Sequence, residues 1–129
     1  MATAETFIAV VDDEPAVRTM LGRVLALAGY RIVAFATGEA FLASLDAAAL
    51  PACAIVDIHM PGLGGLAVQA RLHGAGPAIP VIFITASDDD GLDRAACEAG
   101  AASLLRKPFP SEALLAAVAA ALNANKGGT

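Results

Sequence analysis

Short runs of apolar residues alternate along the chain with longer stretches whose apolar positions recur at helical spacing. The runs are only four or five residues long and most are rich in Val, Ile and Phe, which is typical of strands. We therefore predict strands at Phe7–Val11, Arg31–Phe35, Ala52–Val56, Val81–Ile84 and Ser103–Arg106.

The stretches between these runs predict amphipathic helices, because their apolar residues recur every three or four positions. The pattern is clearest after the first run, where Pro15 suits the first turn of a helix and Gly29 suits its C-terminal end. The further helices are expected at Gly38–Leu45, at Leu66–Leu72 with an end at Gly74, at Asp89–Ala99 ending before Gly100, and at Ser111–Ala124.

Alternation of strands and helices predicts an α/β fold in which a parallel sheet has helices on both faces. The length of 129 residues fits one domain, so we expect residues 1–129 to form a single unit with a frayed tail at 125–129. The glycine and proline clusters fall between the predicted elements, and no internal linker is apparent.

Composition narrows the class of protein. Hydrophobic residues make up 57 % of the chain, which excludes a disordered protein, yet the longest apolar stretch, Ala113–Leu122, is too short to span a membrane. The net charge of −5 is a poor match for phosphate backbones, so we expect no direct binding to nucleic acid. Cys53 and Cys97 form neither a zinc motif nor a redox pair, and no export signal is visible, so we expect a cytoplasmic protein.

Polar residues follow four of the predicted strands, at the point where each strand ends. Asp12 and Asp13 follow the first strand, Asp57 follows the third, Thr85 closes the fourth and Lys107 follows the fifth. Because the carboxyl ends of parallel strands meet at one edge of a sheet, these side chains should converge in one pocket.

Such a pocket would suit phosphoryl transfer. Two carboxylates about 4 Å apart repel each other by about 4 kcal/mol at an effective dielectric of 20, so the cluster needs a positive partner or a raised pKa. Mg²⁺ fits this need because it prefers oxygen ligands and also binds phosphate oxygens. A nucleophilic acid, a metal site, the ammonium of Lys107 and the hydroxyl of Thr85 could together position a phosphoryl group and neutralise its charge.

These residues, in this order, resemble the receiver domain of two-component response regulators, and the likeness extends from Val11–Pro15 to Lys107–Phe109. The resemblance implies a flavodoxin-like (βα)5 fold with strand order 2-1-3-4-5. It also implies that Asp57 accepts a phosphoryl group from a histidine kinase or a histidine phosphotransfer protein. Within the family, the stretch from Ala16 to Leu42 is similar to receivers of the FixJ type.

The same resemblance assigns roles to the neighbours of Asp57. Mg²⁺ would be bound by Asp12, Asp13, Asp57 and the backbone carbonyl of His59, while Thr85 and Lys107 would hold the phosphoryl oxygens. A cis peptide bond is expected before Pro108. The surface formed by the fourth helix, fifth strand and fifth helix would mediate the output, either as a homodimer or by docking an effector.

The chain departs from the family pattern at two positions. Receivers usually carry Tyr or Phe three residues before the lysine, where this chain has Leu104, so we expect the phosphorylation signal to be transmitted differently or weakly. His59 stands two residues after the acceptor, where its ring could hinder the water that hydrolyses the phosphoryl group or orient that water as a base; we favour hindrance.

Three other functions compete with this interpretation. A small aspartate-nucleophile phosphatase would need an acid where His59 stands. A flavin-binding module would need small hydroxyl residues after the first strand, where this chain has Asp12 and Asp13. A receiver kept only as an interaction scaffold remains an alternative because of Leu104.

Overall fold

The computed structural model describes residues 6–46, 49–75, 78–86 and 90–127, and within them strands and helices alternate from end to end. In chain order the elements are β1 (Ile8–Val11), α1 (Pro15–Leu27), β2 (Ile32–Phe35), α2 (Gly38–Ser44), β3 (Cys53–Asp57), α3 (Gly65–Ala75), β4 (Val81–Thr85), α4 (Asp90–Glu98), β5 (Ser103–Arg106) and α5 (Ser111–Gly127).

The strands form one parallel sheet in the order β2-β1-β3-β4-β5, which confirms the predicted doubly wound α/β fold. The strand order reverses direction between β1 and β3, which are neighbours in the sheet. The chain continues from β1 to a helix on one face of the sheet and from β3 to a helix on the other face. In this class of sheet, ligands bind outside the carboxyl ends of the strands at such a switch point. The topology therefore predicts a binding site at the residues that follow β1 and β3.

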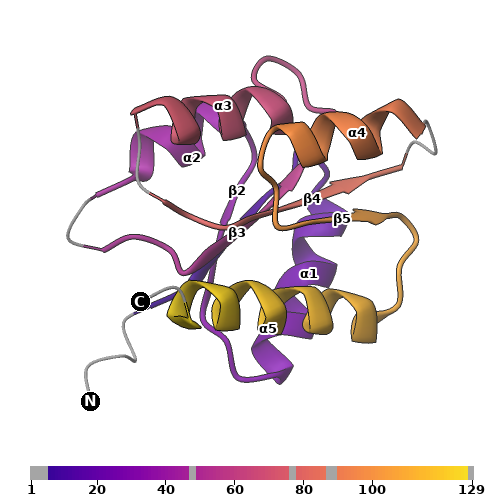
Figure 1. Cartoon of the computed structure of the whole chain (residues 1–129). Coiled ribbons are helices and arrows are strands. Elements are labelled where there is room, and N and C mark those ends of the chain that lie inside the picture. The colour runs from indigo at the N-terminus through magenta and orange to yellow at the C-terminus, as the bar shows by residue number, and fades with distance from the viewer. Residues whose placement is uncertain (1–5, 47–48, 76–77, 87–89, 128–129) are drawn as a thin grey trace.

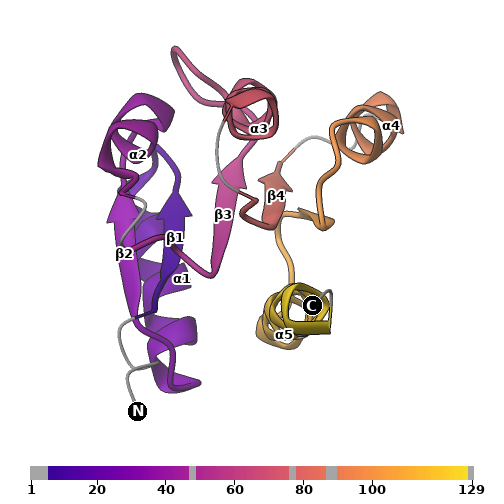
Figure 2. The same cartoon turned by 60° about the vertical axis from the view of Figure 1, so that its left-hand side comes forward.

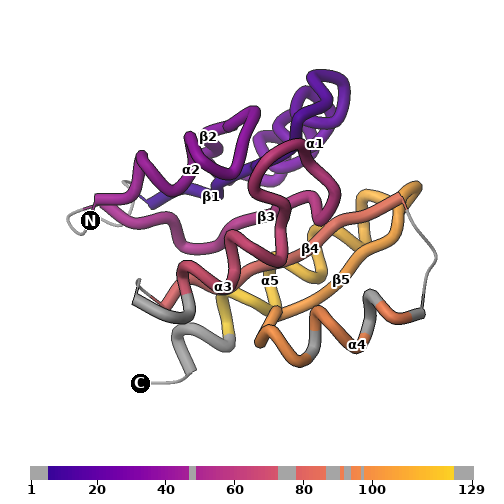
Figure 3. The backbone as a smooth tube through the Cα atoms, turned by 90° about the horizontal axis from the view of Figure 1, so that it is seen from above, coloured from indigo at the N-terminus to yellow at the C-terminus, as the bar shows by residue number. Residues whose placement is uncertain are grey.

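Helices cover both faces of the sheet (Figures 1 and 2). Helices α2, α3 and α4 lie along one face, and Figure 3, which looks onto this layer, shows them one after another across the sheet. Helices α1 and α5 cover the other face. The core is accordingly split into two clusters, one centred on Phe41 and Phe83 and the other on Leu21, Leu25 and Leu114.

Burial along the strands explains their sequence patterns. Every residue of β1, β3 and β4 is buried, as expected for continuous apolar runs covered by helices on both faces. The edge strands β2 and β5 are partly exposed. The buried centre of the sheet therefore carries Asp57 and Thr85, the final residues of β3 and β4.

The helix ends differ in places from the prediction. Helix α1 ends as expected before Gly29, whose φ of +97° is a backbone conformation that glycine adopts without strain. Helix α3 does not stop at Gly74 but continues to Ala75, because a single glycine only weakens a helix. Helix α5 extends to Gly127, beyond the predicted end at Ala124; residues 128 and 129 of the expected frayed tail lie outside the described residues.

Two further observations bear on the class of protein. Among the described residues, no helix combines the length and the apolar character that crossing a bilayer requires. Cys53 is a free, buried thiol, and burial raises its pKa to about 12, so this cysteine is an unreactive core residue. The side chain of Cys97 lies outside the described residues.

Candidate functional site

The register of the sheet places Asp12 and Asp57 side by side. Val11 of β1 is paired with Val56 of β3, and each aspartate is the next residue along its strand direction. Thr85 follows Ile84, which is the partner of Asp57, and is itself paired with Arg106, the residue before Lys107. The parallel register alone therefore brings the predicted polar residues to one edge, as the sequence indicated.

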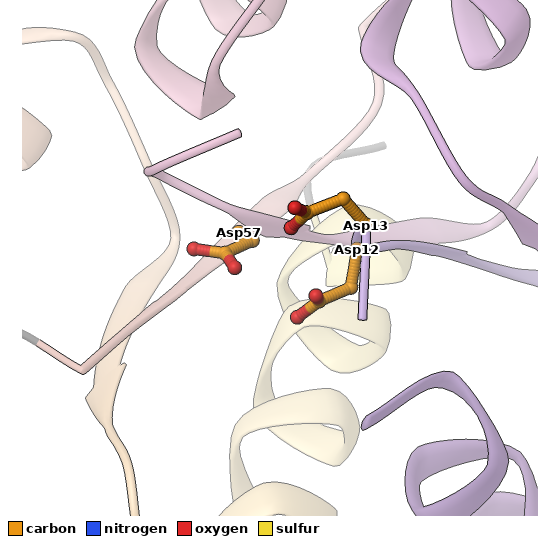
Figure 4. Close-up of side chains that lie close together, drawn as sticks. All are labelled: Asp12, Asp13 and Asp57. Carbon is orange, nitrogen blue, oxygen red and sulfur yellow. The ribbon is translucent and has the colours of Figure 1, made fainter. Parts of the chain in front are cut away.

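Three aspartates form a compact acidic cluster at this edge. One carboxylate oxygen from each of Asp12, Asp13 and Asp57 can be chosen so that all lie within 4.8 Å of one another. Figure 4 shows Asp12 and Asp13 extending from the segment after β1 toward Asp57 at the end of β3. Asp12 is fully buried and Asp57 is 5 % exposed, whereas Asp13 is exposed to solvent. The cluster is therefore buried at Asp12 and Asp57 and open to solvent at Asp13.

Lys107 supplies positive charge to the cluster. Its Nζ lies 3.2 Å from Oδ2 of Asp12 and 3.3 Å from Oδ2 of Asp57, close enough to donate a hydrogen bond to each. A third contact, 3.4 Å long, joins Nζ to Oε1 of the exposed Glu14. One ammonium therefore faces several carboxylates, and the region keeps an excess of negative charge.

The pKa values of Asp12 and Lys107 both depart from their ordinary values. Burial raises the pKa of Asp12 above its ordinary 3.8, the amide of Glu14 that donates to Oδ1 at 2.9 Å opposes the rise, and the charge of Asp57 adds to it. Burial alone would lower the pKa of Lys107, but the charges of Asp57 and Asp12 outweigh burial and raise it. Lys107 therefore stays an ammonium, while Asp12 holds its charge less readily than a solvated aspartate.

Thr85 and His59 flank Asp57. Thr85 is fully buried at the end of β4, and its carbonyl accepts a hydrogen bond of 2.7 Å from the amide of Lys107. The backbone amide of His59 donates a hydrogen bond to Oδ1 of Asp57 at 3.0 Å, while His59 itself is exposed to solvent. The peptide bond between Lys107 and Pro108 is cis, as the family resemblance implied.

Leu104 of β5 packs against the hydrophobic core. It is paired with Phe83 of β4, is half-buried, and packs against the core on the α2, α3 and α4 side of the sheet. The leucine therefore fills the position of the family's aromatic residue with apolar packing alone.

Sequence reasoning missed two contacts around the cluster. Glu14 precedes α1 but makes no side-chain bond to the helix, and its carboxylate contacts Lys107 instead. Arg18, one turn further, donates from Nη1 to the carbonyl of Asp12 at 2.8 Å. Glu14 is acidic and directly follows two candidate ligands, which was a signal in the sequence for its role. The contact of Arg18 depends on the path of the backbone and has no such signal.

The donor set fits a hard divalent cation. All the side-chain ligand atoms are carboxylate oxygens, which Mg²⁺ prefers, and the exposed side at Asp13 leaves space for water and phosphate oxygens. Burial is the main cause of the raised pKa of Asp12, and the negative charge of Asp57 adds to it. A bound cation would favour the ionised form of Asp12 against both effects.

Comparisons with known proteins agree with this geometry. A family model described as the response regulator receiver domain matches residues 8–119. The chain is 38 % identical over 122 residues to the response regulator protein TmoT of Ectopseudomonas mendocina, which covers 95 % of this chain and 55 % of TmoT. It is 39 % identical over 119 residues to response regulator MprA of Mycobacterium tuberculosis, covering 92 % and 51 %. The chain thus spans about half the length of the curated relatives it matches.

Solved structures of receivers are also similar to this chain. A crystal structure of a response regulator receiver protein from Burkholderia phymatum is 42 % identical, with a TM-score of 0.81 and coverage of 92 % of this chain and 95 % of that one. The crystal structure of FixJ-N has a TM-score of 0.84 at 29 % identity, covering 92 % and 94 %.

Proposed function

The chain belongs to the family of two-component response regulator receiver domains, and on that basis we propose that Asp57 accepts a phosphoryl group. Receivers are signalling domains. We propose further that this one is bacterial and cytoplasmic, and that it promotes only its own phosphorylation and dephosphorylation. The donor is a histidine kinase or a histidine phosphotransfer protein.

One observation carries the proposal: the amino group of Lys107 lies within 3.3 Å of Asp57 while Asp12 and Asp13 flank the same carboxylate. A nucleophilic carboxylate, an acidic cation site and a fixed ammonium are the parts that phosphoryl transfer requires. Asp12 and Asp57 are buried, and the lysine that contacts both directly follows β5, two strands away from β3 in the sheet.

In the proposed reaction, a carboxylate oxygen of Asp57 forms a bond to phosphorus as the bond from phosphorus to the donor's imidazole nitrogen breaks. The product is an aspartyl phosphate, and the donor histidine is released. The amide of His59 holds Oδ1 of Asp57 and so orients the carboxylate for attack. Lys107 exchanges a carboxylate partner for a phosphoryl oxygen, and the hydroxyl of Thr85 donates to another.

Mg²⁺ would be held by Asp12, Asp13 and Asp57. The family resemblance adds the backbone carbonyl of His59 to these ligands. When bound, the ion supplies positive charge that neutralises the phosphoryl oxygens. The chain's own residues do the remaining work: Asp12 and Asp13 keep the region attractive to a cation, and Arg18 fixes the backbone of Asp12 through its carbonyl.

The output surface is proposed to be the face formed by α4, β5 and α5. β5 connects this face to the site, because Lys107 follows its last residue directly. A change in the contacts of Lys107 would therefore act on the end of β5. We propose that a second copy of the chain or an effector binds this face. The matched relatives are about twice as long as this chain.

The proposal is tested by incubating the protein with acetyl phosphate and millimolar Mg²⁺ and measuring its intact mass. We expect a gain of one phosphoryl group that disappears in Asp57→Asn and when the metal is chelated. The matched control is Asp46→Asn, which replaces an exposed acid beyond the end of α2. This variant should be phosphorylated normally. Sustained release of phosphate from unrelated esters would favour the phosphatase, and a folded protein that gains no mass would favour the scaffold.

A further inference from the structure

The loop between β3 and α3 begins at the candidate acceptor and is held closely at its base. It runs from Ile58 to Gly64, and the amide of Gly65 donates to the carbonyl of Ile58 at 3.1 Å. A Cβ added at Gly64 would lie 2.4 Å from the same carbonyl oxygen, so the two ends of the loop touch backbone to backbone. The near end of the loop also carries the His59 amide that binds Asp57.

The far end of this loop contacts α2, an element that has no residue in the acidic cluster. Oε2 of Glu39, in the first turn of α2, accepts a hydrogen bond of 3.4 Å from the amide of Leu63, which is 24 residues further along the chain. Through this contact, a side chain of α2 reaches the loop that follows Asp57.

Two glycines show that the fit between α2 and the loop is close. Gly62 has a φ of +76°, and a Cβ there would lie 2.6 Å from Oε2 of Glu39. A Cβ at Gly38 would lie 2.7 Å from the carbonyl oxygen of Leu63. The turn at Gly62 and the start of α2 are thus shaped around each other, with the carboxylate of Glu39 between them.

The start of α2 is capped by a residue other than Glu39. Thr37 precedes α2, and its Oγ1 accepts a hydrogen bond of 3.0 Å from the amide of Ala40, which caps the helix. The side chain of Glu39 is exposed to solvent. Its replacement should therefore leave α2 folded while removing the contact with the loop.

We infer that Glu39 is a positioning residue, which orders the loop from Ile58 to Gly64 so that the amide and carbonyl of His59 are held in place beside Asp57. The inference rests on the proposed function, since the His59 carbonyl is one of the proposed Mg²⁺ ligands. Through Leu63, Glu39 restricts the outer turn of the loop, and the bond between Gly65 and Ile58 transmits that restriction to the segment around His59.

The test compares Glu39→Ala, Glu39→Gln and the control Glu98→Gln, an exposed acid at the end of α4. Mg²⁺ affinity is measured by calorimetric titration, and amide hydrogen exchange is followed at Leu63 and His59 without metal. We expect Glu39→Ala to bind Mg²⁺ about three- to tenfold more weakly and to exchange faster at both amides, the loss expected for one hydrogen bond. Glu39→Gln should stay within about twofold of wild type, because its amide oxygen can still accept from Leu63.

Three results would overturn the inference: unchanged exchange at His59 in Glu39→Ala, Mg²⁺ affinity in Glu39→Ala equal to that of wild type, or equal weakening in Glu39→Ala and Glu39→Gln. The last result would mean that the charge of Glu39 acts at a distance and that its hydrogen bond is irrelevant. If the wild-type protein itself bound no Mg²⁺ and accepted no phosphoryl group, the proposed function would fail instead. The exchange rates without metal would still decide the role of Glu39.

Discussion

The amino group of Lys107 lies 3.3 Å from a carboxylate oxygen of Asp57, although 50 residues separate the two along the chain. The same amino group contacts Asp12, which is 95 residues away. The lysine therefore joins the ends of β1, β3 and β5, and its charge is part of what makes a buried acidic cluster tolerable in the folded protein.

Replacing Lys107 by methionine should destabilise the protein without metal. The substitution leaves the buried Asp12 and Asp57 facing each other without their cation, and the expected loss is about 1–3 kcal/mol because the lysine is partly exposed. Urea unfolding measures the loss, and millimolar Mg²⁺ should restore part of it. Arg23→Met, which removes an exposed cation on α1, is the control. A Lys107→Met variant as stable as wild type would show that the ion pairs contribute nothing.

The effect of Mg²⁺ on stability should depend on pH. Because burial raises the pKa of Asp12, the folded state binds this proton more tightly than the unfolded chain does. This contribution to stability is complete below the ordinary pKa of 3.8 and is lost as pH rises through the raised pKa. Mg²⁺ binds the ionised form, so the increase in Tm that it causes should be larger at about pH 7.5 than at about pH 4.5.

Differential scanning calorimetry with and without Mg²⁺ across this range provides the measurement. Asp12→Asn has no proton to lose at this position, so its response to Mg²⁺ should be weaker and should depend less on pH. An equal increase in Tm at both pH values in the wild-type protein would mean that Asp12 does not take part in binding the metal.

Leu104 should not act as a rotating switch. Its side chain packs against the core on the α2, α3 and α4 side and cannot reproduce the reach or polar tip of an aromatic ring. Crystal structures with and without beryllofluoride, a phosphoryl mimic, should show the same Leu104 rotamer. An inward change of that rotamer coupled to movement of Thr85 would contradict the prediction, and Leu104→Tyr tests whether an aromatic ring introduces such a change.

His59→Ala should shorten the lifetime of the phosphorylated protein. His59 is exposed and stands two residues after Asp57, so its imidazole is expected to hinder the approach of water, while the backbone amide that binds Asp57 is kept in the variant. A loss of phosphate about threefold faster is expected, equivalent to roughly 0.7 kcal/mol in the barrier to hydrolysis. The decay is followed by intact mass after the donor is removed. An unchanged lifetime would remove His59 from the mechanism, and a longer one would favour its acting as a base.

The order and type of the elements could be predicted from the sequence because the periodicity of apolar residues changes with each element. The strand ends were less certain. Asp57 and Thr85 belong to their strands, since the parallel ladder continues through Asp57 and Ile84 and through Thr85 and Arg106. Neither residue is apolar, so the pattern placed Asp57 outside its strand and ended the next strand at Ile84.

The convergence of Asp12, Asp13, Asp57 and Lys107 was also predictable, because parallel strands bring their carboxyl ends to one edge. Contacts between segments outside the sheet could not be predicted from the sequence. The bond from Gln69 of α3 to the carbonyl of Ala99, 2.9 Å long, depends on how the helices pack, as does the contact between Glu39 and Leu63. No periodicity in the sequence encodes such pairs.

The central claim, that Asp57 is the phospho-acceptor, is tested most directly by trapping the modified residue. Borohydride reduces an aspartyl phosphate to homoserine, so the protein is phosphorylated with acetyl phosphate and Mg²⁺, reduced, digested and sequenced by tandem mass spectrometry. We predict homoserine at position 57 and at no other acidic residue. Homoserine at another aspartate, with Asp57 intact, would contradict the claim.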